Sequence, residues 1–359
     1  MKTMKILIVT VYNSHNSGSF LQAYAMMSVL KEMGHNVQFL KREIKGSSHD
    51  IKRVARRFFL YLIKFRFRQA CYFVYEWFIY EKAQKHFPII SMDSNYYKET
   101  DCIVVGSDTI WNFDSKVLRA LAATYLGNAF IGKHVISYAA SAANTSIELF
   151  QTIIRNNGGL SNIETIMVRD KHTKRLVELS TNKIAYTVTD PTLIVSRSAF
   201  NNLRFDVKTK KPYILLYFLG EMKYNLKKEI QVYASVNKYS IISMPIYRKW
   251  CDRSLMSSPQ NMISYFMSAT AVVTDTFHGT AFSLIYEKPF AVHDDGKNKV
   301  KELLELYGEG DRLFTSPDKL KSILSNKNVV VSSGKLDAVR NNSIKMLKDA
   351  LVNYENSAC

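Results

Sequence analysis

One histidine lies in a stretch whose pattern matches the layout of an enzyme site. The β-rich run Ala271–Thr274 is followed by a polar turn that contains Asp275 and His278, and a helical pattern continues from Gly279. A strand, a short polar turn and a helix place functional groups at the carboxyl end of a parallel sheet. We therefore expect Asp275 and His278 to lie at such an edge.

This turn has the chemistry to bind an anion and to move a proton. The amides of Gly279 and Thr280 would lie at a helix N-terminus, where N–H groups lack partners and the helix dipole favours a phosphate or carboxylate. The unperturbed pKa of histidine lies near neutral pH, so His278 could give or take a proton. A histidine in a turn is also common at surfaces and in cores, which leaves a structural role open.

A second polar cluster follows the apolar residues 102–105. Gly106, Ser107 and Asp108 come directly after this run, and Trp111 follows three residues later. Asp108 could bind a sugar hydroxyl or act as a base, and Trp111 could stack on a sugar face. The alternative is an aspartate that caps a helix and a tryptophan in the core.

Residues 50–87 interleave Lys and Arg with large aromatic residues, and no glycine or proline interrupts them. This pattern predicts one or two helices. One interpretation is a helical segment at an anionic membrane surface. The other is a helical hairpin packed on the domain, with Lys and Arg stems covering apolar surface. Nucleic acid is not the expected partner, because no recognised nucleic-acid module accompanies the basic residues.

The composition bounds the class of protein. The chain has 359 residues with 49 basic and 31 acidic side chains, a net charge of +18 that favours anionic partners. Its four cysteines, Cys71, Cys102, Cys251 and Cys359, are far apart, so we expect neither a disulfide framework nor a zinc site. No apolar run is long enough for a signal peptide or a membrane span. These features predict a cytoplasmic protein, with peripheral binding at the inner membrane face as an alternative.

The order of apolar runs predicts an α/β fold with two domains. Residues 5–40 have the pattern strand, helix, strand, which opens a parallel sheet, and residues 213–219 begin a second one. We expect two Rossmann-like parallel-sheet domains that face a central crevice. The predicted boundaries are 1–200 for the N-terminal domain, with the helical insertion 50–87, then 210–330 for the C-terminal domain and 331–359 for a helix that packs back.

Several motifs at strand ends together resemble the polysaccharide pyruvyl transferase family. They are the loop and helix at residues 13–22, the stretch 105–112 with the pattern G-S-D-x-x-W-N, Arg169-Asp170, residues 189–193 and the D-x-F-H-G motif at residues 275–279. The resemblance extends from Lys5 to about Arg312. It implies a fold similar to the two-domain GT-B glycosyltransferases. It also implies transfer of a pyruvyl group from phosphoenolpyruvate to two hydroxyls of a sugar, as a ketal, with release of phosphate.

The resemblance assigns roles to individual residues. His278 would be the general acid that protonates the vinyl carbon, and Asp108 would orient or deprotonate the acceptor hydroxyl. The expected substrate-binding residues are Gly18, Gln22, Ser107, Trp111, Arg169, Asp190, Arg248, Asp275, Gly279, Thr280, Lys299 and Arg312, with Lys297 a weaker candidate. Arginines can neutralise the leaving phosphate, so we expect no metal, and phosphoenolpyruvate is a co-substrate rather than a cofactor. The N-terminal domain would take the saccharide acceptor, free or lipid-linked, and the C-terminal domain the donor.

The chain departs from some family members, which have an arginine two residues before the histidine where this chain has Thr276. This departure keeps two alternatives open. One is a GT-B-like glycosyltransferase that uses a nucleotide sugar in polysaccharide biosynthesis. The other is a non-catalytic partner in a polysaccharide assembly complex.

Overall fold

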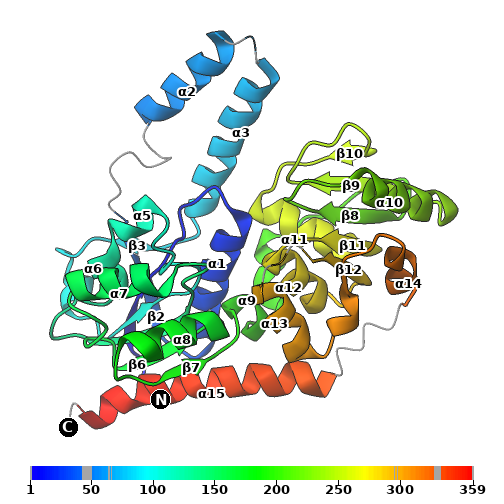
Figure 1. Cartoon of the computed structure of the whole chain (residues 1–359). Coiled ribbons are helices and arrows are strands. Elements are labelled where there is room, and N and C mark those ends of the chain that lie inside the picture. The colour runs from blue at the N-terminus through cyan, green and yellow to red at the C-terminus, as the bar shows by residue number, and fades with distance from the viewer. Residues whose placement is uncertain are drawn as a thin grey trace. The chain divides into compact units, whose positions relative to one another are not determined.

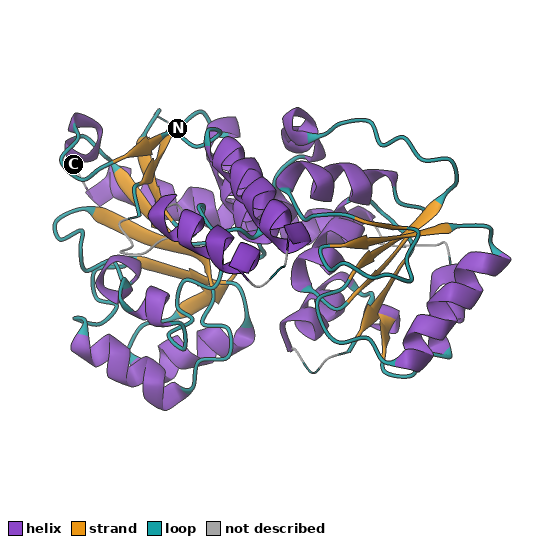
Figure 2. Cartoon of the chain, turned by 90° about the horizontal axis from the view of Figure 1, so that it is seen from above, coloured by secondary structure: helices purple, strands orange, loops and turns teal. Residues whose placement is uncertain are grey.

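The computed structural model describes residues 2–42, 51–63, 65, 67–294, 296, 298–326 and 333–357. The chain forms two compact units, which we consider separately (Figure 1). Unit 1 comprises Met1–Ser196 and Arg340–Cys359, and unit 2 comprises Arg197–Val339. Figure 2 shows helices on both faces of each sheet. Strands covered on both faces are expected to be continuous apolar runs, as the central strands of both sheets are.

Unit 1 is built on a parallel sheet with the strand order β3-β2-β1-β4-β5-β6-β7. Its strands are β1 (Lys5–Val9), β2 (Asn36–Leu40), β3 (Ile89–Ile90), β4 (Cys102–Val105), β5 (His134–Ala140), β6 (Thr165–Val168) and β7 (Ala185–Thr187). Its helices are α1 (Ser17–Glu32), α2 (Ile51–Ile63), α3 (Phe67–Gln84), α4 (Asn95–Lys98), α5 (Lys116–Arg119), α6 (Ala122–Tyr125), α7 (Ile147–Asn156), α8 (Lys171–Ser180) and α9 (Pro191–Ile194).

The last helix, α15 (Ser333–Ser357), returns to unit 1 in its C-terminal part. The Nε atom of Arg340 donates to the carbonyl of Ile194 (2.7 Å), and the hydroxyl of Ser343 accepts from the amide of Thr189 (3.1 Å). These contacts join the end of the chain to the segment around β7 and α9.

Unit 2 has a second parallel sheet with the strand order β10-β9-β8-β11-β12-β13. Its strands are β8 (Tyr213–Tyr217), β9 (Ser240–Met244), β10 (Arg253–Ser254), β11 (Ala271–Thr274), β12 (Phe290–His293) and β13 (Leu313–Phe314). Its helices are α10 (Tyr224–Val236), α11 (Pro259–Ser268), α12 (Phe277–Ile285), α13 (Asn298–Tyr307) and α14 (Lys319–Ser325), with 3-10 turns at Arg197–Leu203 and Gly310–Arg312.

Both sheets reverse their strand order once. The chain adds strands to one side of β1 and then continues on the other side at β4, and unit 2 does the same at β8 and β11. In open parallel sheets, ligands bind outside the carboxyl ends of the strands at this switch point. The prediction of two Rossmann-like parallel-sheet domains is confirmed, and each unit has one edge where a site is expected.

Gly106 forms part of the switch point of unit 1. Its φ is +118°, and a Cβ atom there would lie 2.3 Å from the carbonyl oxygen of Tyr138 on β5. Only glycine allows the chain to pass this close to the neighbouring strand.

Gly106→Ala should therefore lower the free energy of unfolding, measured by denaturant titration, by more than a loss of backbone freedom alone. We expect about 1–3 kcal/mol from the clash in addition to about 1–2 kcal/mol from the positive φ. Gly132 is a matched control, because its φ is +77° and nothing lies within 4 Å of its Cβ position. Equal losses for Gly106→Ala and Gly132→Ala would contradict this interpretation.

Candidate active site

Asp275 joins the ends of the two central strands of unit 2. Its carboxylate accepts hydrogen bonds from the amides of Leu219 (2.8 Å) and Gly220 (2.6 Å), which follow β8. Asp275 follows β11 and is 1% exposed. Both carboxylate oxygens already accept partly buried N–H groups, and the prediction that Asp275 binds substrate stays a prediction. Asp275 holds the two strand ends together.

The first turn of α12 is capped from within the protein. The hydroxyl of Thr276 accepts a hydrogen bond from the amide of Gly279 (2.9 Å), and its carbonyl accepts one from the amide of Thr280 (3.0 Å). These are the two amides for which the sequence predicts an anion. Both already donate, so this prediction is corrected: Thr276 is the N-cap and uses these amides itself.

Packing explains why position 279 is glycine. A Cβ atom there would lie 2.1 Å from Oγ1 of Thr274 and 2.6 Å from Oγ1 of Thr276. These distances are far shorter than any real contact of a Cβ atom. The glycine therefore allows the first turn of α12 to lie directly against the end of β11.

His278 is the second residue of α12 and is partly exposed. Its ring packs edge-on against Phe277, with the ring centroids 5.4 Å apart and the planes at 88°. The cap made by Thr276 and the close packing of Gly279 flank it and hold its backbone in place. A partly exposed imidazole at this edge is placed to exchange a proton with a bound molecule.

Arg248 extends from the end of the neighbouring strand, β9. Its Nη2 atom donates to the carbonyls of Phe218 (3.1 Å) and Gly220 (3.3 Å). Its Nε atom is buried and has no hydrogen-bond partner within the described ranges. A guanidinium has five N–H donors, so Arg248 is fixed by two contacts and retains donors for an anion.

Arg312 is used within the fold. It is 4% exposed, and its Nε atom donates to Glu309 (2.9 Å). Its Nη1 atom donates to the carbonyls of Ile323 (3.1 Å) and Asn326 (3.1 Å). These internal groups hold its guanidinium, and the prediction that Arg312 clamps a substrate stays a prediction.

The two predicted lysines lie near the start of α13. Lys299 is in the first turn of that helix and is partly buried, so its role stays a prediction. Lys297 falls outside the described residues.

Asp108 is the central polar residue at the switch point of unit 1. Its Oδ2 atom accepts a hydrogen bond from the hydroxyl of Ser19 (2.6 Å), and its Oδ1 atom accepts one from the amide of Thr109 (2.7 Å). Its φ is +74°, a conformation that few residues other than glycine adopt. Asp108 caps no helix, and it keeps 8% of its surface exposed. Ser19 is not among the predicted site residues. Its position in the polar segment after the first strand is the sequence feature that could have identified it.

Arg169 lies among carboxylates beside Asp108. Its Nη1 atom is 3.1 Å from Oδ2 of Asp190 and 3.9 Å from Oδ1 of Asp108. Burial by itself would lower the pKa of Arg169, but the carboxylates of Asp190, Asp108 and Asp170 outweigh it and raise the pKa. The charge of Arg169 is thus balanced within the protein, and its predicted role as an anion clamp is corrected to that of a counter-charge for Asp108.

Asp190 has no exposed surface. Besides Arg169, its carboxylate accepts from the amide (3.0 Å) and the hydroxyl (2.8 Å) of Thr192, which starts α9. Asp190 orients Arg169 and caps a helix, and the prediction that it contacts substrate stays a prediction.

Gln22 and Ser107 connect the segment after β1 to the segment after β4. The amide group of Gln22 donates to the carbonyls of Val11 (3.1 Å) and Ser19 (2.8 Å), and the hydroxyl of Ser107 donates to its Oε1 atom. Both side chains are fully buried. They position the loops around Asp108, and their predicted contact with substrate is not supported.

Trp111 and Gly18 also have structural roles. The indole of Trp111 is fully buried in the core of unit 1 and donates to the carbonyl of Tyr125 (2.8 Å), so it cannot stack on a sugar here. The amide of Gly18 donates to the side chain of Asn16 (2.8 Å), the N-cap of α1. The predicted substrate contacts of both residues are corrected accordingly.

Each unit therefore has a small number of reactive groups at its switch point; those of unit 2 are partly exposed, and Asp108 of unit 1 is 8% exposed. Unit 1 offers the carboxylate of Asp108, held by Ser19 and Arg169. Unit 2 offers the imidazole of His278 and the guanidinium of Arg248. These groups suit proton transfer and the binding of an anion. In the described part of the chain, no group of three or more His, Cys, Asp or Glu side chains is placed to hold a metal ion.

Comparison with known proteins places the chain among transferases of polysaccharide synthesis. The family model described as polysaccharide pyruvyl transferase matches residues 16–294. Comparison with curated proteins finds no match.

Solved structures with a similar fold include several UDP-N-acetylglucosamine 2-epimerases. One is 11% identical, covers 99% of this chain and 97% of its own, and has a TM-score of 0.54. A Listeria monocytogenes protein described in this way is 10% identical, with coverages of 99% and 98% and a TM-score of 0.54. The Neisseria meningitidis enzyme, bound to UDP-GlcNAc, is 10% identical, with coverages of 97% and 99% and a TM-score of 0.51. At these identities the similarity shows the fold alone, which is GT-B-like.

Asp275→Asn should destabilise unit 2. The substitution replaces one carboxylate oxygen with an NH₂ group that faces a partly buried backbone N–H, and the loss of this hydrogen bond costs about 0.5–1.5 kcal/mol. Denaturant titration measures this loss, and Asp206→Asn is the control because Asp206 is exposed. If both variants unfold like the wild type, Asp275 does not hold the strand ends together.

Proposed function

The chain belongs to the polysaccharide pyruvyl transferase family and is a transferase, and we propose that its donor is phosphoenolpyruvate and its product a pyruvyl ketal. The acceptor is a sugar of a cell-surface or exopolysaccharide precursor. The observation that carries this proposal is the family match over residues 16–294. The accessible groups at the two switch points support it.

The reaction makes two carbon–oxygen bonds and breaks one. Two acceptor hydroxyls bond to carbon 2 of phosphoenolpyruvate, and the bond from carbon 2 to the phosphate oxygen breaks. Carbon 3 gains a proton and becomes a methyl group, and inorganic phosphate leaves. The two protons lost by the hydroxyls balance the one gained by carbon 3 and the one carried off by phosphate. The chemistry needs an acid, a base and cations for the donor.

The residues of unit 2 suit the donor. His278 is partly exposed in the first turn of α12, where it can serve as the acid for carbon 3. Arg248 is anchored to Gly220 at the adjacent strand end, and its buried Nε atom has no hydrogen-bond partner within the described ranges. A guanidinium binds phosphate or carboxylate through paired N–H groups.

The residues of unit 1 suit the acceptor. Asp108 is held by Ser19, its Oδ1 atom lies 3.9 Å from Nη1 of Arg169, and its carboxylate is the candidate base for a sugar hydroxyl. Asp190 keeps Arg169 in place from the opposite side.

Thr276 accounts for the departure from relatives that have arginine at this position. Its hydroxyl caps α12, which an arginine side chain cannot do in the same way. Arg248, which follows β9, supplies a cation instead. The absence of arginine at position 276 is therefore compatible with an anionic donor.

Phosphoenolpyruvate should stabilise the protein against thermal unfolding, by roughly 2.7 kcal/mol at a hundred times its dissociation constant. His278→Gln should keep this stabilisation but release phosphate about 10²–10⁴-fold more slowly with a lipid-linked saccharide extract as acceptor, because it removes the acid and not the anion site. His86→Gln is the control, since His86 is exposed on the segment after α3. Stabilisation by UDP-sugars and not by phosphoenolpyruvate would replace this proposal with a nucleotide-sugar glycosyltransferase.

The helices α2 and α3 suit a membrane-bound acceptor. The two helices lie side by side as a hairpin (Figure 1). At the turn between them, Ile63 is 72% exposed, Phe65 83% and Phe67 57%. The base of α3 is anchored in unit 1, where Tyr80 shares a hydrogen bond with Ser17 (2.8 Å). Exposed apolar side chains on a hairpin that is anchored at its base indicate a surface that binds another molecule or a membrane.

The positive charge of the hairpin favours an anionic lipid surface as its partner. Within residues 51–85 the basic residues outnumber the acidic ones; they are Lys52, Arg53, Arg56, Arg57, Lys64, Arg66, Arg68, Lys82 and Lys85, against Glu76 and Glu81. Basic residues among aromatic ones are typical of segments that lie at a bilayer interface. No helix within the described ranges has the length and apolar character to cross a bilayer. We infer that the hairpin rests on the membrane surface and that the acceptor is lipid-linked.

Binding to vesicles that contain phosphatidylglycerol should fall steeply as salt is raised, because salt screens the basic residues. Replacing Ile63, Phe65 and Phe67 together by serine should weaken this binding at least about tenfold, since each buried apolar side chain contributes roughly 1.5–3 kcal/mol. Ile131→Ser is the control, because Ile131 is 86% exposed and lies outside the hairpin. Equal sedimentation of both variants with vesicles would show that the hairpin serves another partner.

A further inference from the structure

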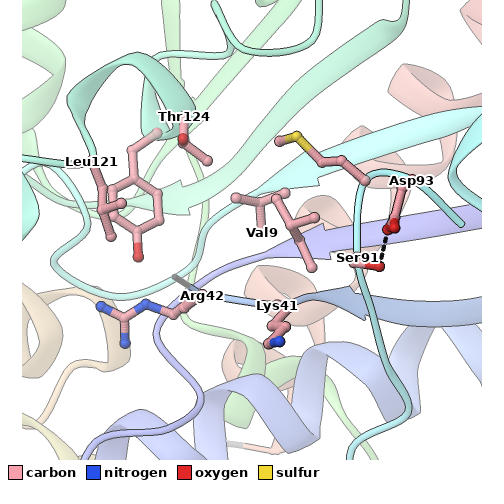
Figure 3. Close-up of a pocket in the computed structure, with 10 residues that line it drawn as sticks. Val9, Lys41, Arg42, Ser91, Asp93, Leu121 and Thr124 are labelled. Carbon is pink, nitrogen blue, oxygen red and sulfur yellow. Dashed lines mark hydrogen bonds between the residues drawn. The ribbon is translucent and has the colours of Figure 1, made fainter. Parts of the chain in front are cut away.

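A cavity of about 550 Å³ opens at the carboxyl edge of the sheet in unit 1 (Figure 3). Val9 ends β1, Lys41 and Arg42 follow β2, and Ser91 follows β3. Tyr125, the last residue of α6, completes the wall. None of these residues is among those considered so far for the reaction, and the volume is that of an ordinary small-molecule site.

Two buried donors in this wall lack partners. The hydroxyl of Tyr125 and the Nε atom of Arg42 have no hydrogen-bond partner of good geometry within the described ranges. Tyr125 is 1% exposed, and burial raises its pKa while the nearby charge of Arg42 acts in the opposite direction. A guanidinium accepts no hydrogen bond, so the hydroxyl proton still lacks an acceptor even beside Arg42. Leaving such groups unpaired costs free energy, which a ligand with acceptor oxygens would recover.

The charges of the cavity favour an anion at one end. Arg42 lies with Leu121 and Thr124 on one side, and Ser91 and Asp93 lie on the other (Figure 3). The hydrogen bond from Ser91 lowers the pKa of Asp93, so this carboxylate is ionised. It is bound to Ser91 at the end of the cavity away from Arg42. The end near Arg42 presents a cation, a phenol and the hydroxyl of Thr124, all able to donate to an oxyanion.

The position of Arg42 is fixed by residues 13–19, the segment that also contacts Asp108. The Nη1 atom of Arg42 donates to Oδ1 of Asn13 (2.5 Å), in the loop between β1 and α1. Ser19, near the other end of that segment, donates to Asp108. The cavity and the candidate base are therefore held by the same stretch of chain, and a molecule bound in one can affect the other.

We propose that this cavity binds the anionic group of a saccharide, a phosphate or carboxylate, with Arg42 and Tyr125 as its donors. Lys41 adds a second positive charge, and Val9 and Leu40 give an apolar wall for a sugar ring. That this saccharide is the acceptor rests on the proposed function; the binding of the anion does not.

Calorimetric titration without phosphoenolpyruvate tests the cavity by itself. The probes are inorganic phosphate and a panel of hexose 1-phosphates, hexuronic acids and their uncharged methyl glycosides. Charged saccharides should bind, their uncharged glycosides at least about tenfold more weakly, because a hydrogen bond to a charged group contributes about 1.5–3 kcal/mol. Arg42→Gln should weaken binding of the charged probes about tenfold or more, and Tyr125→Phe several-fold.

The controls separate binding from folding. Tyr125→Phe should change the thermal midpoint little, because the hydroxyl proton has no acceptor to lose within the described ranges. Tyr186→Phe and Arg155→Gln are matched controls at exposed positions of unit 1 and should leave binding unchanged.

Three outcomes would overturn the proposal. The first is an affinity for charged saccharides that neither Arg42→Gln nor Tyr125→Phe changes. The second is that no charged saccharide binds. The third is that inorganic phosphate binds as tightly as every charged saccharide. Because no donor is present, a protein that proves unable to use phosphoenolpyruvate would still show this binding. Failure of the cavity would likewise leave the donor chemistry untouched.

Discussion

The carboxylate of Asp275 is the interaction on which the site of unit 2 depends. At the switch point β8 and β11 send their loops to opposite faces, so the amides after β8 need acceptors from outside the ladder. Asp275 supplies them for Leu219 and Gly220. Gly220 has room for no side chain, because a Cβ atom would lie 2.8 Å from the carboxylate. Its carbonyl then anchors Arg248.

In unit 1 the two strand ends at the switch point are also held together, but by two neutral side chains instead of a carboxylate. The amide of Gln22 and the hydroxyl of Ser107 join the loops after β1 and β4. In unit 2, Asp275 joins the loops after β8 and β11 in the corresponding way. A buried arginine, Arg169, then balances the carboxylates of Asp108 and Asp190. Removing one partner of such a buried group leaves an uncompensated charge, so the group holds Asp108 in its unusual backbone conformation.

These constraints determine what is left for chemistry. Most polar residues at the strand ends are used to hold the ends together, and few remain accessible. The accessible groups divide by charge, with a carboxylate beside donors in unit 1 and an imidazole and a guanidinium in unit 2. That division suits a transferase whose donor is doubly anionic and whose acceptor must lose protons. Under our proposals, the basic, aromatic hairpin binds an anionic lipid surface and the cavity around Arg42 binds an anionic saccharide.

The sequence by itself determined the two parallel sheets, because buried strands are continuous apolar runs and switch-point loops follow them directly. It also placed His278 at the start of a helix, since the D-x-F-H-G pattern is local, and its motifs pointed to the family. It could not tell which polar residues face a ligand. Trp111 and Arg312 were predicted to bind substrate, yet their partners, Tyr125 and Ile323, come from other elements, and only tertiary packing buries them. Arg42 and Tyr125 lie far apart in the chain and meet only because β2 and α6 end at the same edge of one sheet.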